Sequence, residues 1–363
     1  MYAPRRILVV KLATLGDLLT ATPALRALRS TFPQTHIGVL ATPRSAGALR
    51  GLDSFDEVLT FDKFGFDRPG EALGNLRQAL QLTRALHQGD WDTLVLLHHL
   101  TTRFGIVKYA ALCLGSGAPQ RIGLDNGRGR WFLTHSAVDF GFGERHEVDY
   151  WLEVVKVLGA EHPSTPRLEL CIAPDEYGFA ELYAPNNAVL LVPGSGHWST
   201  ARRWAANRFV EVGRALRERY GLQPLVLGGV GEDEQRLASG IAQALHATVI
   251  PTAPSPQALG ALIRRCRLVV ANDSGPVHLA TAVGTRVVAI FGPSNDRAWG
   301  PYPPDDPRHQ VAREVVACAP CIHRGHDFGT PQGCAARTCL AILEPQTVLA
   351  AAERALALVG SAA

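Results

Sequence analysis

Short apolar runs recur along this chain and alternate with longer segments whose apolar residues have helical spacing. Runs such as residues 7–10 and 268–271 contain no polar positions, which is typical of parallel strands covered on both faces. Strands are predicted at residues 6–11, 36–41, 56–61, 92–98, 120–123, 187–192, 224–228, 247–250, 268–271 and 287–291. Helices are predicted at residues 23–31, 71–88, 101–114, 146–158, 207–220, 232–245, 256–265 and 346–358.

Two successive series of strand-helix units predict an α/β protein with two parallel-sheet domains. A Pro-containing stretch, residues 162–166, interrupts the pattern between the two series. The chain has 363 residues, which is longer than one hydrophobic core usually organises. We therefore expect a first domain over residues 1–165, a second over residues 166–343, and a last helix within residues 344–363.

Composition excludes several classes of protein. Hydrophobic residues make up 47% and charged residues 19%, which indicates a globular chain. No apolar run approaches the ~20 residues that cross a bilayer, and the first residues lack the features of a signal peptide. We therefore expect a cytoplasmic protein. The formal charge of +3 comes without a stacking platform of aromatic and basic residues, so nucleic acid is not an expected partner.

A polar turn between a predicted strand and a predicted helix, residues 272–278, carries candidate binding residues. The first amides of a helix, together with its dipole, favour an anion such as a nucleotide diphosphate. Asp273, Ser274 and His278 lie where such a ligand would bind. The alternative is that Asp273 or Ser274 only caps the helix, although a cap does not require His278 one turn after the turn residue Gly275.

The chain begins with a second element of this design, in which the first strand runs into a turn containing Gly16 and Asp17. It is not a dinucleotide fingerprint, because no G-x-G-x-x-G follows the strand. Asp17 is a candidate general base, or else a carboxylate that is favoured only by its place at a helix start. Lys11, at the strand end, either serves this site or is an edge lysine that reaches solvent.

A third turn, residues 192–195, ends a strand with glycine and serine, whose amides and hydroxyl suit phosphate oxygens. Arg202 and Arg203 follow and would add fixed positive charge for a departing diphosphate. The alternative is a solvated pair of arginines before a helix. A further glycine turn, residues 228–232, is a candidate nucleoside site with Glu232 on the ribose.

Four stretches of this chain together resemble glycosyltransferase family 9, the bacterial heptosyltransferases. They are Val10-Lys11 through Gly16-Asp17 with Thr22-Pro23-Ala24-Leu25-Arg26, Val192-Pro193-Gly194-Ser195 with Arg202-Arg203-Trp204, Asn272 through His278, and Phe291-Gly292-Pro293-Ser294 with Trp299-Gly300-Pro301. The resemblance implies the GT-B fold, in which two Rossmann-like parallel-sheet domains face a central cleft. It also implies that the last helix packs back on the first domain.

The resemblance implies an inverting glycosyltransferase that moves heptose from ADP-heptose to a hydroxyl of an acceptor, the lipopolysaccharide inner core. Asp17 would be the catalytic base, with Lys11 near the acceptor or steadying Asp17. Donor-binding residues would be Thr14, Gly16, Gly194, Ser195, Arg202, Arg203, Glu232, Asp273, Ser274, Gly275 and His278. Family members usually carry Lys where this chain has Arg202, so the arginine that contacts phosphate stays open. No catalytic metal is required by this scheme.

Two other classes of function stay open beside this one. The first is a GT-B enzyme that uses another nucleotide sugar or a protein acceptor. The second is a non-catalytic nucleotide-binding relative. Residues 61–68 and 121–131 combine aromatic and basic side chains that would suit peripheral contact with a glycolipid at the inner face of the cytoplasmic membrane. Ordinary exposed loops have the same composition.

The cysteines fall into two groups. Cys113, Cys171 and Cys266 stand singly in apolar contexts and are expected to be buried. Four others form a Cys-rich loop over residues 318–339, which comprises Cys318, Cys321, Cys334 and Cys339. In a reducing cytoplasm this spacing favours a structural zinc or iron site over a disulfide framework. Free thiols or a labile disulfide are the alternatives.

Overall fold

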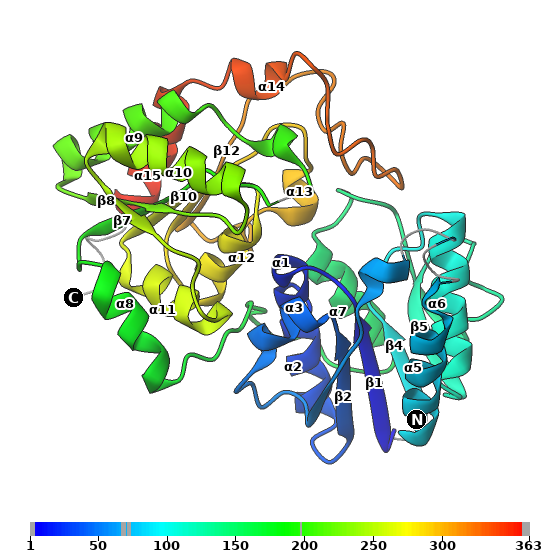
Figure 1. Ribbon diagram of the computed structural model, residues 1–363. Helices are drawn as coiled ribbons and strands as arrows, with labels where there is room; N and C mark the ends of the chain where they lie inside the picture. Colours follow the sequence, from blue (N-terminus) through cyan, green and yellow to red (C-terminus); the bar gives the residue numbers. More distant parts are fainter. Residues whose placement is uncertain (1–3, 67–69, 71–73, 197, 358–363) are drawn as a thin grey trace. The chain divides into compact units, whose positions relative to one another are not determined.

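The computed structural model describes residues 4–66, 70, 74–196 and 198–357 (Figure 1). The chain divides between Pro166 and Arg167 into two units, one residue beyond the boundary expected from the sequence. Residues 71–73 and 358, at the ends of two predicted helices, lie outside the described residues. None of the helices in the described ranges is long and apolar enough to span a bilayer.

The first unit is built on a parallel sheet with the strand order β3-β2-β1-β4-β5-β6. Its strands are β1 (Arg6–Lys11), β2 (His36–Ala41), β3 (Glu57–Thr60), β4 (Thr93–Leu96), β5 (Gln120–Asp125) and β6 (His135–Val138). Its helices are α1 (Leu15–Leu19), α2 (Thr22–Thr31), α3 (Pro43–Ala46), α5 (Leu76–Gln88), α6 (Arg103–Gly115) and α7 (Glu147–Val157), with short 3-10 turns at Gly47–Leu49 and Lys63–Phe66.

The second unit repeats this topology with the order β9-β8-β7-β10-β11-β12. Its strands are β7 (Ala188–Val192), β8 (Gln223–Leu227), β9 (Thr248–Ile250), β10 (Leu268–Asn272), β11 (Val287–Ile290) and β12 (His309–Ala312). Its helices are α8 (Tyr177–Tyr183), α9 (Ala206–Tyr220), α10 (Glu232–Leu245), α11 (Pro256–Arg265), α12 (Gly275–Ala282), α13 (Asp296–Trp299), α14 (Thr338–Ala341) and α15 (Pro345–Leu356), with 3-10 turns at Pro174–Glu176 and Thr200–Arg202.

The two parallel sheets confirm the predicted fold class. In each sheet the strand order reverses beside the first strand, between β1 and β4 and between β7 and β10. Ligands of such sheets bind outside the carboxyl ends of the strands at this reversal. Val10 pairs with Leu96 and Ala271 pairs with Val192, so the segments that follow these four strands emerge at the two reversal points.

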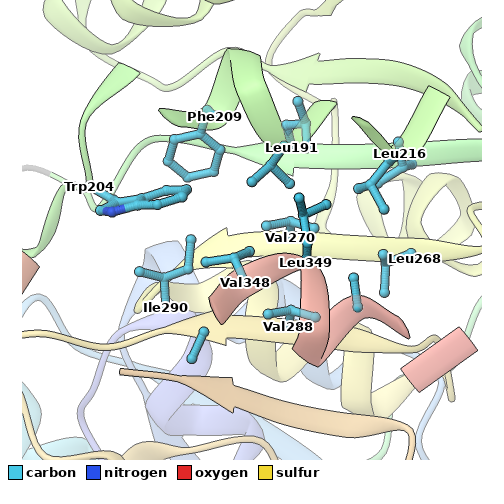
Figure 2. Close-up of a cluster of buried hydrophobic side chains, with 14 of the residues drawn as sticks. Leu191, Trp204, Phe209, Leu216, Leu268, Val270, Val288, Ile290, Val348 and Leu349 are labelled. Atoms are coloured by element: carbon cyan, nitrogen blue, oxygen red, sulfur yellow. The ribbon is translucent and has the colours of Figure 1, made fainter. Parts of the chain in front are cut away.

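Helix α15 packs on the second unit, and its expected packing on the first domain stays a prediction. Its buried face joins the core that α9 and α10 form on the second sheet. Figure 2 shows Val348 and Leu349 of this helix beside Val270, Val288 and Ile290 of the strands. Burial of this apolar face stabilises α15 on the sheet of its own unit.

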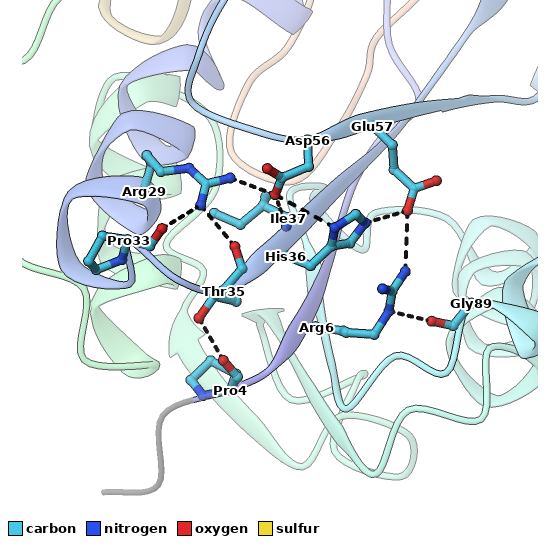
Figure 3. Close-up of polar contacts among 10 residues, drawn as sticks. All are labelled: Pro4, Arg6, Arg29, Pro33, Thr35, His36, Ile37, Asp56, Glu57 and Gly89. Atoms are coloured by element: carbon cyan, nitrogen blue, oxygen red, sulfur yellow. Dashed lines mark hydrogen bonds and ion pairs between the residues drawn. The ribbon is translucent and has the colours of Figure 1, made fainter.

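Polar contacts bind together the amino ends of β1, β2 and β3, at the opposite edge from the strand ends discussed above (Figure 3). Glu57 accepts a hydrogen bond from Arg6 at 3.3 Å and lies 2.6 Å from the ring Nε2 of His36. Arg29 donates to Asp56 at 2.6 Å. These charged groups bond to each other, which indicates a structural role for this edge.

Candidate active site

Asp17 lies in the first turn of α1, just after the carboxyl end of β1, where its carboxylate is oriented by a neighbour. The Thr14 hydroxyl donates to Asp17 Oδ2 at 2.8 Å. Thr14 is exposed, Asp17 is half-buried and Gly16 between them is buried. The Thr14 side chain does not cap the helix. The structure therefore holds a carboxylate in a set orientation beside an exposed hydroxyl, as proton transfer with a bound alcohol requires.

Lys11 ends β1 as a buried residue, so it is not an edge lysine that reaches solvent. Its ammonium lies 3.8 Å from the ring centroid of Trp151, a cation-π contact. Burial lowers the pKa of Lys11 to about 8, against the opposing attraction of Glu147 and Asp17. The lysine therefore belongs to the interior of the site, at the reversal point of the first sheet.

The turn after β7 is held by a carboxylate that the sequence analysis did not single out. Glu234 Oε1 accepts hydrogen bonds from the amides of Ser195 and Gly196, each at 2.9 Å. A Cβ on Gly194 would lie 2.8 Å from the same oxygen, and one on Gly229 would lie 2.0 Å from Glu234 Oε2. These glycines make room for Glu234. The Ser195 amide, which was predicted to hold phosphate, already binds an anionic group of the protein, as does the amide of Gly196.

Glu234 could have been found from its position as the third residue of α10, after a glycine N-cap. A glutamate at this position commonly reaches back to backbone N–H groups. The sequence instead led to the prediction that Glu232 contacts the ribose. That side chain is 89% exposed and lies 3.6 Å from Arg236 of the same helix, so the structure does not bring it to the turn after β7.

The two adjacent arginines have different surroundings. Arg203 donates to Glu234 at 3.0 Å and to Asp233 at 2.8 Å, and the pairing with Arg203 holds the pKa of Asp233 below its usual value. Arg203 also donates to the Ser195 hydroxyl at 3.3 Å. Through these contacts the Arg203 guanidinium links the turn after β7 to the start of α10.

Arg202 instead joins the ends of β7 and β10. It donates to the Ser195 carbonyl at 2.7 Å and to Asp273 Oδ2 at 3.2 Å. Its Nε is buried and has no hydrogen-bond partner in the described part of the chain. A buried donor without a protein partner is costly, so this guanidinium is suited to accept an anionic ligand.

The turn after β10 is organised by Asn272, whose amide reaches across to the neighbouring strand. It accepts from the Trp204 amide at 3.1 Å and donates to the Pro193 carbonyl at 2.7 Å. Ser274 is the N-cap residue of α12, but its hydroxyl donates to the Asn272 carbonyl and does not cap. His278, the fourth residue of this helix, is buried.

The structure thus brings Gly194, Ser195, Arg202, Arg203 and Asp273 into one group at the reversal point of the second sheet, next to the start of α12. The capping alternative for Ser274 is not observed, and Asp273 is engaged by Arg202. The carboxylates of Asp233, Glu234 and Asp273 compensate the two guanidiniums. The group is therefore not the purely cationic pocket that two adjacent arginines suggest.

An aromatic group also lies beside Arg202 and was missed by the sequence analysis. The Arg202 guanidinium is 5.5 Å from the centroid of the Trp198 ring, which stacks on His323 at 5.0 Å. His323 belongs to the Cys-rich loop, and Ser199 donates to Pro331 of that loop at 2.6 Å. The loop is therefore packed directly against the segment that carries Arg202.

All seven cysteines are free thiols. Cys113 and Cys266 are buried as expected, and burial raises the pKa of each thiol to about 12, whereas Cys171 is half-exposed. In the Cys-rich loop, burial first and then the nearby thiols raise the pKa values of Cys321 and Cys339. Among the residues that the structure describes, no three metal-binding side chains are placed to hold one ion.

The two loops expected at a membrane surface differ in exposure. Trp131 is 61% exposed, whereas Phe66 is buried, and residues 67 and 68 lie outside the described ranges. Arg121 donates to the carbonyls of Phe132 and Ala118, at 2.7 and 2.6 Å. Membrane contact by these loops stays a prediction.

Two Rossmann-like units with polar side chains at both strand-order reversals are the architecture of GT-B glycosyltransferases. The family described as glycosyltransferase family 9 (heptosyltransferase) matches residues 79–330, which is most of the chain. This protein therefore belongs to glycosyltransferase family 9.

Individual relatives agree with this assignment. The lipopolysaccharide core heptosyltransferase OpsX of Haemophilus influenzae is 23% identical over 305 residues, which cover 83% of this chain and 82% of the relative. The crystal structure of a family 9 glycosyl transferase from Veillonella parvula has a TM-score of 0.73 at 22% identity and covers 97% of each chain.

Two further structures share the fold. The ADP-heptose lipopolysaccharide heptosyltransferase II of E. coli has a TM-score of 0.71 at 19% identity, over 97% of this chain and 98% of that one. TibC, an iron-containing dodecameric glycosyltransferase of enterotoxigenic E. coli, has a TM-score of 0.60 at 13% identity, over 100% and 81%.

Proposed function

We propose that this protein is an inverting heptosyltransferase that moves heptose from ADP-heptose to a hydroxyl of the lipopolysaccharide inner core. One observation carries the proposal: a family 9 chain has an oriented carboxylate, Asp17, at the strand-order reversal of one sheet and an Arg202–Asp273 pair at that of the other. The names of the heptosyltransferase relatives support the donor and the acceptor. We propose that the enzyme acts in the cytoplasm, at the inner face of the membrane.

In this proposal the first unit binds the acceptor and the second unit binds the donor. Asp17 removes the proton of the acceptor hydroxyl, which attacks the anomeric carbon from the face opposite the departing ADP. The Thr14 hydroxyl keeps the carboxylate in its orientation. Proton removal of this kind contributes about 10²- to 10⁴-fold, and juxtaposing the two substrates contributes more.

The donor binds at the second unit, where its contacts combine charge with a helix terminus. Arg202 offers its unpartnered Nε to the diphosphate, and its charge stabilises the negative charge that develops as ADP departs. Asp273 accepts hydrogen bonds from sugar hydroxyls. The start of α12, with Ser274, Gly275 and His278, lies against the diphosphate. Fixed charges and amides take the place of a catalytic metal.

The test is the Asp17→Asn variant, which keeps the size of the side chain and removes the base. Transfer from ADP-heptose to a lipopolysaccharide inner-core acceptor should fall by about 10²-fold or more. Calorimetry should find ADP-heptose binding largely retained in the variant, and binding to the wild-type protein should be stronger for ADP-heptose than for UDP-sugars.

The matched control is Asp175→Asn, at an exposed acidic residue of the second unit. It should transfer heptose at the wild-type rate. Unchanged transfer by Asp17→Asn would contradict the catalytic role of Asp17, and preference for a UDP-sugar would contradict the proposed donor.

We further propose that the Cys-rich loop binds a structural zinc or iron ion through Cys318, Cys321, Cys334 and Cys339. The amide of Arg337 donates to Cys334 Sγ at 3.2 Å, a backbone hydrogen bond that orients this sulfur. Binding would draw the four thiols closer together than they lie in this structure, in a loop that also supports Trp198 through His323. The iron-containing relative TibC supports the choice of metal.

Elemental analysis tests this second proposal on the whole protein after reducing purification without chelators. We expect close to one zinc or iron per chain, and a Cys318→Ser, Cys321→Ser double variant should lose it. Less than about 0.2 metal per chain in the wild-type protein would rule out a resident ion. A Cys113→Ser, Cys266→Ser double variant, which changes only the buried lone thiols, controls for general effects of removing cysteine.

A further inference from the structure

His99 follows β4 and is held between two acidic residues. Its Nδ1 lies 2.9 Å from Asp139 Oδ1, and its Nε2 lies 2.9 Å from Glu147 Oε1. The side chains of His99 and Glu147 are each only 5% exposed, and that of Asp139 is fully buried. A neutral imidazole has one N–H and can donate to only one of two carboxylates. Two buried carboxylates at both nitrogens therefore indicate an imidazolium.

The surroundings of His99 reinforce this charge state. Burial by itself lowers the pKa of His99, but Glu147 and Asp139 outweigh it and raise the pKa to about 9. The Phe142 and Tyr150 rings make T-shaped contacts with the imidazole, at centroid distances of 4.7 and 5.0 Å. These contacts fix the ring in position, so His99 is a rigid buried cation.

The neighbouring histidine has the opposite character. His98 Nε2 accepts a hydrogen bond from the Leu12 amide at 2.9 Å, which requires an unprotonated nitrogen. Burial and the charge of Lys11 keep the pKa of His98 well below its usual value. Two adjacent histidines thus differ in charge, and His98 joins β4 to the segment between Lys11 and Asp17.

Glu147, which is hydrogen-bonded to His99, also attracts the Lys11 ammonium electrostatically. The glutamate is the largest electrostatic attraction on the Lys11 ammonium, followed by Asp17, while Lys63 acts in the opposite direction. Trp151, one turn after Glu147 on α7, lies under the ammonium and donates through Nε1 to Thr20 Oγ1 at 3.1 Å. Thr20 in turn donates to the main-chain carbonyl of Asp17 at 2.8 Å.

We propose that Glu147 and His99 are positioning residues for glycosyl transfer: His99 fixes the Glu147 carboxylate, and Glu147 holds the Lys11 ammonium on Trp151 and beside Asp17. The inference rests on the proposed function of Asp17. The ammonium favours the ionised carboxylate of Asp17 in the free enzyme, and it offsets the loss of hydration as the acceptor covers the base. Lys11 must carry its proton to do so.

This arrangement has a consequence for the pH dependence of transfer. Because the pKa of Lys11 is lowered to about 8, the ammonium is charged below this pH and loses its proton as the pH rises through it. The groups that act on it are Glu147 of α7, Asp17 of α1, Lys63 and the neutral His98. We expect kcat/KM to fall on the alkaline side near pH 8.

The discriminating variant is Glu147→Gln, which keeps an oxygen for His99 and removes the negative charge beside Lys11. Without this attraction Lys11 loses its proton at lower pH, so the alkaline limb of kcat/KM should move down by about one pH unit or more. Lys11→Met should lower kcat at every pH and abolish the limb. The matched control is Glu144→Gln, at an exposed residue three positions earlier, and it should keep the wild-type profile.

A limb at the same pH in wild type and Glu147→Gln, or full activity in Lys11→Met, would overturn the proposal. If ADP-heptose were not bound, or if Asp17→Asn were fully active, the proposed function itself would fail. An unmoved limb in an enzyme that needs Asp17 would refute only the role of Glu147.

A measurement on the unmodified protein keeps the test independent of whether the variants fold. In ¹⁵N NMR spectra of the histidine side chains, His99 is assigned through contacts with the Tyr150 and Trp151 rings. We expect both of its nitrogens to be protonated at pH 8, with His98 neutral in the same spectrum. A neutral His99 at that pH would remove the cation on which the proposal depends.

Discussion

Adjacent residues of the same type have different partners in this protein, and these partners decide what each can do. Arg203 is bonded to Asp233, Glu234 and the Ser195 hydroxyl, whereas Arg202 keeps a buried Nε without a partner in the described chain. The same contrast separates His98, a hydrogen-bond acceptor, from His99 between two carboxylates. Residue type alone is therefore a weak guide to role at these positions.

Arg202 and Arg203 should respond differently to substitution. Arg202→Met removes the charge that meets the diphosphate and should lower kcat/KM by about 10²- to 10³-fold, while Arg202→Lys should recover much of this loss. Arg203→Met leaves Asp233 and Glu234 without their cation, so it should chiefly lower the melting temperature and weaken ADP-heptose binding.

Steady-state kinetics, calorimetry and thermal unfolding of the three variants separate these effects. Arg236→Met, which removes an exposed arginine that lies 3.6 Å from Glu232 of its own helix, provides the control. Equal losses of kcat in Arg202→Met and Arg203→Met at unchanged thermal stability would contradict the division of roles.

Helices and strands were predicted best where their apolar face is continuous. Strands β1, β7 and β10 lie within one or two residues of the predicted ranges, because buried central strands consist almost entirely of apolar residues. Edge strands β6 and β12 were not predicted, since their sequences, His-Ser-Ala-Val and His-Gln-Val-Ala, carry no such run. Pairing with β5 and β11 makes them strands.

Helix α15 offers a test of packing at the scale of one element. Leu349 is 7% exposed and lies in the core of the second unit, so Leu349→Ala should lower the free energy of unfolding by about 2–5 kcal/mol. Leu182→Ala makes the same change at a side chain that is 73% exposed and should cost little. Chemical denaturation followed by circular dichroism provides the comparison, and equal midpoints for the two variants would refute the packing described for α15.

At the scale of the whole molecule, one topology is used twice with different chemistry at the same place. Each unit has a parallel sheet whose strand order reverses beside its first strand. The first unit places Lys11, Asp17 and the His99 network there, and the second places Arg202 and Asp273. The proposed reaction divides along the same line, with proton removal assigned to one unit and binding of the diphosphate to the other.

The sequence by itself determined the two parallel sheets and the three turns that carry Asp17, Ser195 and Asp273, because both follow from local patterns of apolar runs, glycines and helix starts. The tertiary structure alone decided the partners of the charged groups. Glu234 reaches the turn after β7 from 38 residues further along the chain, and Glu147 meets His99 from 48 residues away. Such contacts depend on which strands become neighbours, and no local pattern encodes that.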